Sequence, residues 1–297
     1  MSPNMFGRPD DPINEDPTEI SSPNAPNVNV AYPTFNDWLG LYNFHNTLTR
    51  GEAWNRSLFT DMKGSYERAV LALLNLIAKS SVGRAVLIEI MLGPLFEVRI
   101  LPYDFQSGQW SVGTGAVTQA WNQRASWVKD VPLSGQTADG KPYVSTSATT
   151  GRPIVGTGVG SSADIFFTPS RHKRKNAAEE TLLHELLHAS RKVRGVTYRM
   201  PVSGGYGNIE EFLAVTVSNM YRSQKKEPLK DYHGYEIKPS TFLDSNLSPT
   251  PRLLLGYMRN KQKSLFERLA ALDDAPFNPM KQVKAEGDAL IRKIEHA

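Results

Sequence analysis

The chain has 297 residues, of which 40% are hydrophobic and 22% charged, and this ordinary globular composition excludes a wholly disordered, repeat or collagen-like chain. It contains no cysteine and six histidines. Disulfide scaffolds, zinc fingers, thiol nucleophiles and iron–sulfur sites are therefore excluded, and any transition metal must bind to histidine and carboxylate side chains. The formal net charge of +4 is too small to predict a nucleic-acid-binding protein.

The amino-terminal stretch is rich in Pro, Asn, Asp and Ser. We predict a flexible leader over residues 1–33, because few large apolar side chains offset the entropy of ordering it. No apolar segment follows a basic start, so no usual secretory signal peptide is expected. The most apolar stretches, residues 69–78 and 85–101, are too short or are interrupted by charged residues, so we expect no membrane span.

Residues 34–297 are predicted to form one α+β domain with a small mixed sheet and a mostly helical carboxy-terminal part from about residue 250. Between residues 106 and 160, Gly, Ser, Thr and Pro favour hairpins and loops over long helices. Apolar spacing and turn signals predict the remaining elements. In chain order these are helices over 61–79 and 81–91, strands over 96–101 and 163–168, and helices that begin near 176 and 209.

The motif H-E-L-L-H lies in the helix predicted after residue 176, with His184 and His188 four residues apart. Four residues on a helix return to nearly the same face, so both imidazoles project to one side about one turn apart and reach a single Zn²⁺ ion. Glu185 is offset from that face, where it can accept a proton from metal-bound water. This arrangement is typical of a metal-dependent hydrolase.

The surroundings of the motif are those of a helix. Asn176 and Glu179 have the spacing of a capping box, and Gly195 follows as a helix end. The alternative is a core helix whose histidines are only hydrogen-bonded. That interpretation is disfavoured, because so apolar a helix would leave several polar groups to satisfy.

A third protein ligand is expected, and residues 193–198 contain no histidine at the spacing of the metzincins. Glu210 and Glu211 open the next apolar helix, directly after Asn208. A carboxylate on such a buried helix needs a cation, and zinc would supply it. The residues also allow a different interpretation, in which Asn208 caps the helix and Glu211 is its capping-box partner. Which glutamate binds the metal stays open at this point.

The run H-E-L-L-H-A, followed by E-E-F-L-A-V-T-V-S-N-M-Y, resembles the HExxH gluzincin-type zinc metallopeptidases of bacterial effectors and toxins. These include NleD-like type III effectors and peptidase domains of type VI secretion proteins, and E-F-L-A is similar to the ligand helix of anthrax lethal factor. The resemblance covers residues 163–233 and implies a zincin-like fold in which Glu211 is the third zinc ligand. It also implies that the substrate peptide lies extended along the strand at 163–168, and that residues 227–234 are a recurring extension.

Amide hydrolysis also needs a donor that stabilises the oxyanion. We consider Tyr206, in a glycine-rich loop shortly before Glu211, and then His233. The basic run at residues 171–175 is interpreted as a solvated loop. At the rim of the cleft it would favour acidic substrates.

The sequence thus predicts a zinc-dependent endopeptidase with Glu185 as general base. As the resemblance implies, it would be exported without a cleaved signal and would act on a protein in the cytoplasm of a target or host cell. Its further partners would be secretion machinery or a cognate immunity or chaperone protein. The alternative is a non-catalytic protein-binding module with a structural or vestigial zinc site.

Overall fold

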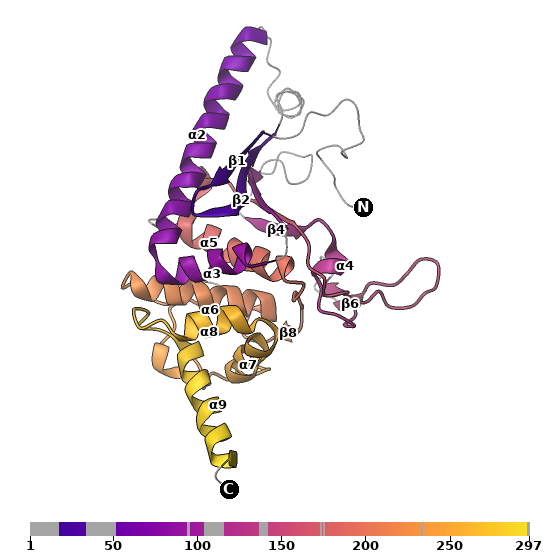
Figure 1. The fold of residues 1–297 in the computed structure, drawn as a ribbon, viewed down its shortest axis with the longest axis vertical. Coiled ribbons are helices and arrows are strands. Elements are labelled where there is room, and N and C mark those ends of the chain that lie inside the picture. The colour runs from indigo at the N-terminus through magenta and orange to yellow at the C-terminus, as the bar shows by residue number, and fades with distance from the viewer. Residues whose placement is uncertain are drawn as a thin grey trace.

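In the computed structural model, which describes residues 18–33, 52–93, 96–103, 116–136, 142–172, 174, 176–232 and 234–295, the chain folds as a mixed α+β protein. Sheet and helices alternate along the first two thirds of the chain, and helices dominate the rest (Figure 1). The helices are α2 (Glu52–Lys79), α3 (Ser81–Met91), α4 (Gln123–Ser126), α5 (Ala177–Val193), α6 (Ile209–Gln224), α7 (Pro251–Lys261), α8 (Lys263–Ala270) and α9 (Pro279–Glu295).

The main sheet has five strands in the order β1-β2-β3-β7-β4. Strands β2, β3 and β7 run parallel, and β1 and β4 pair antiparallel at the two edges. Two small hairpin sheets, β5 with β6 and β8 with β9, complete the strand pairing of the described residues. The strands are β1 (Thr18–Ser22), β2 (Ala25–Tyr32), β3 (Val98–Leu101), β4 (Val117–Ala120), β5 (Ser134–Gln136), β6 (Pro142–Val144), β7 (Ala163–Phe166), β8 (Pro201–Val202) and β9 (Gly207–Asn208).

The prediction of a flexible leader is wrong for residues 18–32, which form β1 and β2. Val28 and Val30 alternate with asparagines and are fully buried, and this alternation of period two is the pattern of a strand with one face in the core. Residues 1–17 of the predicted leader lie outside the described residues.

The prediction that residues 163–168 form a substrate-binding edge strand is also wrong. Ala163–Phe166 of this run form β7, which is paired with β3 on one side and β4 on the other. The backbone hydrogen bonds of β7 are therefore used within the sheet, and its apolar residues Ala163 and Ile165 are fully buried. The edge on this side of the sheet is β4.

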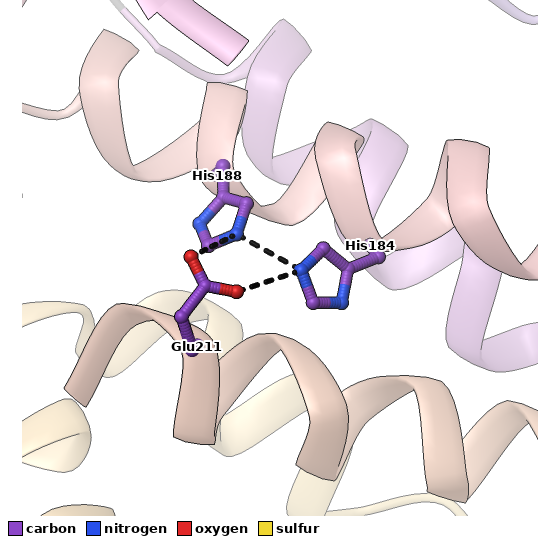
Figure 2. A group of neighbouring side chains, drawn as sticks. All are labelled: His184, His188 and Glu211. Atoms are coloured by element: carbon purple, nitrogen blue, oxygen red, sulfur yellow. Dashed lines mark hydrogen bonds and ion pairs between the residues drawn. The ribbon is translucent and has the colours of Figure 1, made fainter. Parts of the chain in front are cut away.

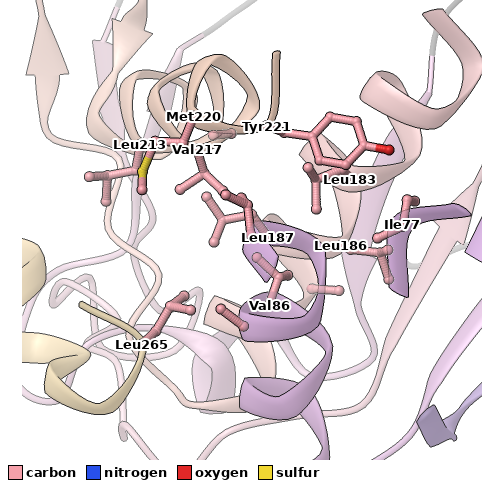
Figure 3. Close-up of a cluster of buried hydrophobic side chains, with 14 of the residues drawn as sticks. Ile77, Val86, Leu183, Leu186, Leu187, Leu213, Val217, Met220, Tyr221 and Leu265 are labelled. Atoms are coloured by element: carbon pink, nitrogen blue, oxygen red, sulfur yellow. The ribbon is translucent and has the colours of Figure 1, made fainter. Parts of the chain in front are cut away.

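Helices α3 and α5 pack against the sheet, and α6, α7 and α8 form the next layer (Figure 1). Between α3, α5 and α6, with contributions from α2 and α8, the core consists mainly of aliphatic side chains together with Tyr221, all shielded from water, as Figure 3 shows. Removing apolar surface from water contributes about 25 cal/mol per Å² to the free energy of folding, so the packing of these helices stabilises the fold. Residues labelled there include Ile77, Val86, Leu183, Leu186, Leu187, Leu213, Val217, Met220 and Leu265.

The predicted helices at 81–91 and after 209 are confirmed as α3 and α6, and α2 begins before the predicted residue 61. No single helix among the described residues is long and apolar enough to cross a membrane. Residues 106–115 and 137–141 of the stretch predicted to form hairpins and loops lie outside the described part of the chain.

Candidate metal centre and cleft

Helix α5 presents two faces of different chemistry. Its leucines at 182, 183, 186 and 187 are fully buried in the core, and the opposite face carries His184 and His188. The helix begins at Ala177, as predicted, but Asn176 has a left-handed backbone (φ 61°) and makes no capping hydrogen bond through its side chain. The predicted capping box is therefore absent, and Asn176 donates a hydrogen bond to Glu227 instead.

The two histidines of α5 meet one glutamate of α6 (Figure 2). The Nε2 atoms of His184 and His188 lie 3.1 Å apart. Glu211 places Oε2 3.1 Å from Nε2 of His184 and Oε1 3.5 Å from Nε2 of His188. Three ligand-type atoms from two helices thus converge on one point.

The electrostatics of this triad favour positive charge at that point. Burial alone would raise the pKa of Glu211, but the charge of His188 and hydrogen bonds from both histidines hold it far below its ordinary value. Burial alone would lower the pKa of His184, but the hydrogen bond and charge of Glu211 and the charge of Glu185 raise it. The triad therefore combines a carboxylate that stays ionised with rings that turn their nitrogens toward it.

Donor type and spacing both suit Zn²⁺. Two imidazole nitrogens and one carboxylate are a frequent ligand set of catalytic zinc, and tetrahedral bonds of about 2.0–2.2 Å place neighbouring ligand atoms about 3.3–3.6 Å apart. The two 3.1 Å separations, from Nε2 of His184 to Nε2 of His188 and to Oε2 of Glu211, are close to this range, and one ligand atom of each residue lies within 4.8 Å of the other two. The side chains of His184 and Glu211 are 20% and 26% exposed, which leaves one side of the triad facing the cavity.

Glu210 and Glu211 have separate partners, although they are adjacent. Asn208 caps α6 by accepting hydrogen bonds from the backbone N–H groups of both glutamates. Arg191 of α5 donates to Oε2 of Glu210 at 2.7 Å and to Oε1 at 2.8 Å, and Tyr198 N–H donates to Oε1 at 2.9 Å. The structure therefore places Glu210 in a buried ion pair and Glu211 with the histidines.

A second set of contacts joins the other ends of α5 and α6. Tyr221 donates a 3.0 Å hydrogen bond to Glu179, and Arg222 donates a 2.5 Å hydrogen bond to Glu180. Together with the Arg191 pair, these contacts fix the antiparallel helices at both ends. The triad lies between the two sets of contacts.

Glu185 lies beside the triad and not within it. Thr118 of the edge strand β4 donates a 2.6 Å hydrogen bond to Glu185 Oε2, and its hydroxyl is also 3.1 Å from the backbone oxygen of Glu185. The side chain of Glu185 is buried but lines the cavity of the triad. One carboxylate oxygen is thus held by β4, which orients the other.

Two adjoining cavities form the cleft. The first, about 220 Å³, contains the triad, Glu185 and Tyr232. The second, about 550 Å³, follows β4 away from the triad and is bordered by Trp121. Residues lining both cavities are Val117, Thr118, Lys192, Thr197 and Arg199.

The predicted oxyanion donors lie elsewhere. Tyr206 is buried, packs edge-on against Phe212 at 5.3 Å between ring centroids, and does not line the triad cavity. His233 lies outside the described residues. Tyr232, which sequence reasoning missed, lines that cavity, and burial followed by the charges of Glu211 and Glu185 raises its pKa. The described residues of the basic run at 171–175 line neither cavity.

Comparison with protein-family models gives no match for this chain, and no curated protein is significantly similar to it. The resemblance to effector metallopeptidases therefore remains a prediction from the sequence motifs. The site itself is defined by its geometry.

Proposed function

We propose that this protein is a zinc-dependent endopeptidase. The observation that carries the proposal is the convergence of His184, His188 and Glu211 on one point, with Glu185 beside them in an open cleft. A Zn²⁺ ion held there would supply Lewis acidity and lower the pKa of water. A zincin-like fold, in which an antiparallel edge strand borders the cleft, is part of this proposal.

The protein's own groups have distinct roles in this mechanism. Glu185 accepts the proton of the attacking water through the oxygen that Thr118 leaves uncommitted, and passes it to the leaving amine. Tyr232 donates its hydroxyl hydrogen bond to the oxyanion. Because the surroundings raise the pKa of Tyr232, the hydroxyl stays protonated at neutral pH and can act as a donor.

Strand β4 is positioned to bind the substrate backbone. It pairs with β7 along one edge, and no described strand pairs with its other edge. An extended peptide added there would form main-chain hydrogen bonds next to the triad. This replaces the predicted binding strand at 163–168 with residues 117–120.

The binding-module alternative is less well supported. Structural zinc sites are usually closed by four protein ligands, whereas catalytic sites have three and one open position. The described residues supply three, beside a cavity. The Glu185 carboxylate next to that open position has a role in catalysis that a structural site does not require.

Metal content and cleavage together test the proposal. Purified protein equilibrated with Zn²⁺ is expected to hold about one ion per chain by mass spectrometry, and Glu185→Gln is expected to retain that ion. Cleavage sites are mapped by amino-terminal labelling of target-cell lysates treated with each protein. Glu185→Gln should lose at least about 100-fold in cleavage rate, and Tyr232→Phe should lower kcat with little change in zinc content.

Glu286→Gln, on the exposed face of α9, is the matched control and should cleave like the wild type. Wild-type turnover by Glu185→Gln would overturn the mechanism. Failure of the wild type to retain zinc would overturn the metal assignment. Unfolding on chelation, followed by circular dichroism, would favour a structural ion.

A further inference from the structure

The second cavity is unlike the first in its charge. Its described lining contains two basic side chains, Lys192 and Arg199, and no acidic one. Lys192 lies on α5 one turn after His188, and Arg199 lies on the segment that follows α5. This basic cavity adjoins the triad, because both basic residues also line the first cavity.

Neither basic side chain has an ion-pair or hydrogen-bond partner within the described part of the chain. The nearby carboxylates already have other partners, since Glu210 is held by Arg191 and Glu211 by the histidines. Lys192 is nevertheless buried. A buried ammonium without a partner is costly, and burial lowers the pKa of Lys192 although the charge of Glu210 opposes that shift.

The wall of this cavity also contains polar atoms that lack partners. The indole Nε1 of Trp127 and the hydroxyl of Thr197 are both buried without a hydrogen-bond partner among the described residues. Buried polar groups in folded proteins are nearly always paired. Both residues line the cavity, and both unpaired groups are hydrogen-bond donors.

The rim is polar and fixed in place. Trp121 donates a 2.9 Å hydrogen bond to Asp164, and the guanidinium of Arg99 lies 4.4 Å from its ring centroid. Asp164 and Arg99 also form an ion pair with each other, with Nε of Arg99 2.8 Å from Oδ1 of Asp164. Both charges are therefore already paired outside the cavity. Among the described residues that line this cavity, Lys192 and Arg199 are the cations that remain for a ligand.

We infer that the second cavity is a specificity subsite that binds a carboxylate of the substrate peptide through Lys192 and Arg199. The inference rests on the proposed peptidase function, because β4 would direct a bound peptide from the triad along this cavity. The carboxylate comes either from an Asp or Glu side chain near the scissile bond or from the free carboxy terminus of the peptide. The first source gives an endopeptidase with acidic selectivity, and the second a carboxypeptidase.

Random decapeptide libraries test this inference. Each library is acetylated at the amino terminus, and one is amidated at the carboxy terminus while the other is left free. After incubation with the zinc-loaded protein, sequencing of the products gives the residue preference at each position around the cut. We expect enrichment of Asp and Glu over Asn and Gln of at least about tenfold at one fixed position of the amidated library.

A cleavage-independent measurement accompanies this assay. Immobilised metal-free protein selects peptides from the same libraries, and the bound fraction is sequenced. Lys192→Met and Arg199→Met should each reduce the acidic enrichment several-fold in both measurements, and Lys192→Glu should shift it toward Lys and Arg. Lys261→Met, at the exposed end of α7, should leave the enrichment unchanged.

The outcomes separate the two proposals. Two results would overturn the subsite and leave the peptidase intact. The first is cleavage with neither an acidic preference nor a dependence on free carboxy termini, and the second is a preference that survives Lys192→Met and Arg199→Met together. Acidic selection by the immobilised protein without any cleavage would support the subsite and argue against the peptidase. Cleavage at a fixed distance from the carboxy terminus that occurs only in the library with free carboxy termini identifies the terminal carboxylate as the ligand.

Discussion

Replacing Arg191 with methionine tests the buried ion pair that joins α5 to α6. Arg191 is fully buried, and the side chain of Glu210 is 5% exposed. The guanidinium makes two hydrogen bonds to Glu210 and two more, to the Val196 carbonyl at 2.9 Å and to Gln262 at 3.1 Å. Arg191→Met removes all four and leaves the carboxylate with the N–H group of Tyr198.

We expect the variant to lose about 3–5 kcal/mol of unfolding free energy, which is the usual cost of breaking a buried pair by removing one partner. The loss has an upper limit, because Glu210 can take up a proton instead of remaining charged. Replacing both partners avoids an isolated charge. The double variant Arg191→Met with Glu210→Gln should therefore be more stable than Arg191→Met alone, with a coupling energy of at least about 2 kcal/mol.

Urea unfolding at pH 7, followed by tryptophan fluorescence, measures these differences. Lys63→Met removes one member of an i,i+4 pair, 3.7 Å from Glu67, and should change the unfolding free energy by no more than about 0.5 kcal/mol. If Arg191→Met costs less than about 1 kcal/mol, or if the two single costs simply add, the pair does not have the role assigned to it.

The effect also has a defined pH dependence. Burial alone would raise the pKa of Glu210, but Arg191 outweighs it and holds the pKa below its ordinary value of 4.5. Stability from such a carboxylate is present above its unfolded-state pKa and is lost as the pH falls through the folded-state value. The gap between wild type and Arg191→Met should therefore be largest near neutral pH and narrow in acid.

Two further predictions concern the ends of α5. At Gly195, φ is +68° and an added Cβ would lie 2.5 Å from the backbone of Gly158, so Gly195→Ala should lower the unfolding free energy by more than about 2 kcal/mol. Gly207 has φ +74° but no atom within 4 Å of an added Cβ, so Gly207→Ala should lower it by only about 1 kcal/mol. Thermal unfolding measures both differences. At the other end, burial and then the hydrogen bond with Glu227 raise the pKa of Glu180 to about 7. Its folded state therefore loses stability as the pH rises from about 4.5 to 7. Glu180→Gln should gain melting temperature relative to wild type between pH 5 and pH 8, and a gap that does not change with pH would contradict this.

Local chemistry made the histidine pair predictable. The four-residue spacing of His184 and His188 determines which side chains share a helix face, whatever the rest of the fold does. The Asn208 cap is equally local, because it depends on the backbone N–H groups of the next turn. The same reasoning failed at Asn176, where the contact with Glu227 brings together residues 51 apart in sequence.

Strand order was less predictable, because it depends on pairing between distant segments. Residues 117–120 are a short Val-Thr-Gln-Ala run with little strand signal, yet they form the edge beside the triad. The more apolar 163–166 run lies inside the sheet, as is usual for strands buried on both faces. The burial of 163–166 explains its apolar sequence, which the substrate-edge interpretation did not.

The residues around the triad illustrate a further limit. Tyr232 reaches the cavity only because α6 and the segment after it fold back toward α5, and its sequence context gives no such signal. From the sequence, Arg191 could be described only as a basic residue near the end of a predicted helix. Its partner Glu210 lies 19 positions away, and packing rather than periodicity selected it over Glu211.

The ion pairs at both ends of α5 and α6 determine whether the proposed metal site keeps its geometry when no metal is bound. Contacts that involve none of the triad residues hold the two helices in register, so the three proposed ligands are already positioned in the absence of an ion. Metal binding would then require little ordering of the chain and would have a small entropic cost. In small zinc modules, by contrast, metal binding provides the free energy that folds the chain. If the proposed zinc binds here, we therefore expect it to dissociate and rebind reversibly while the protein remains folded.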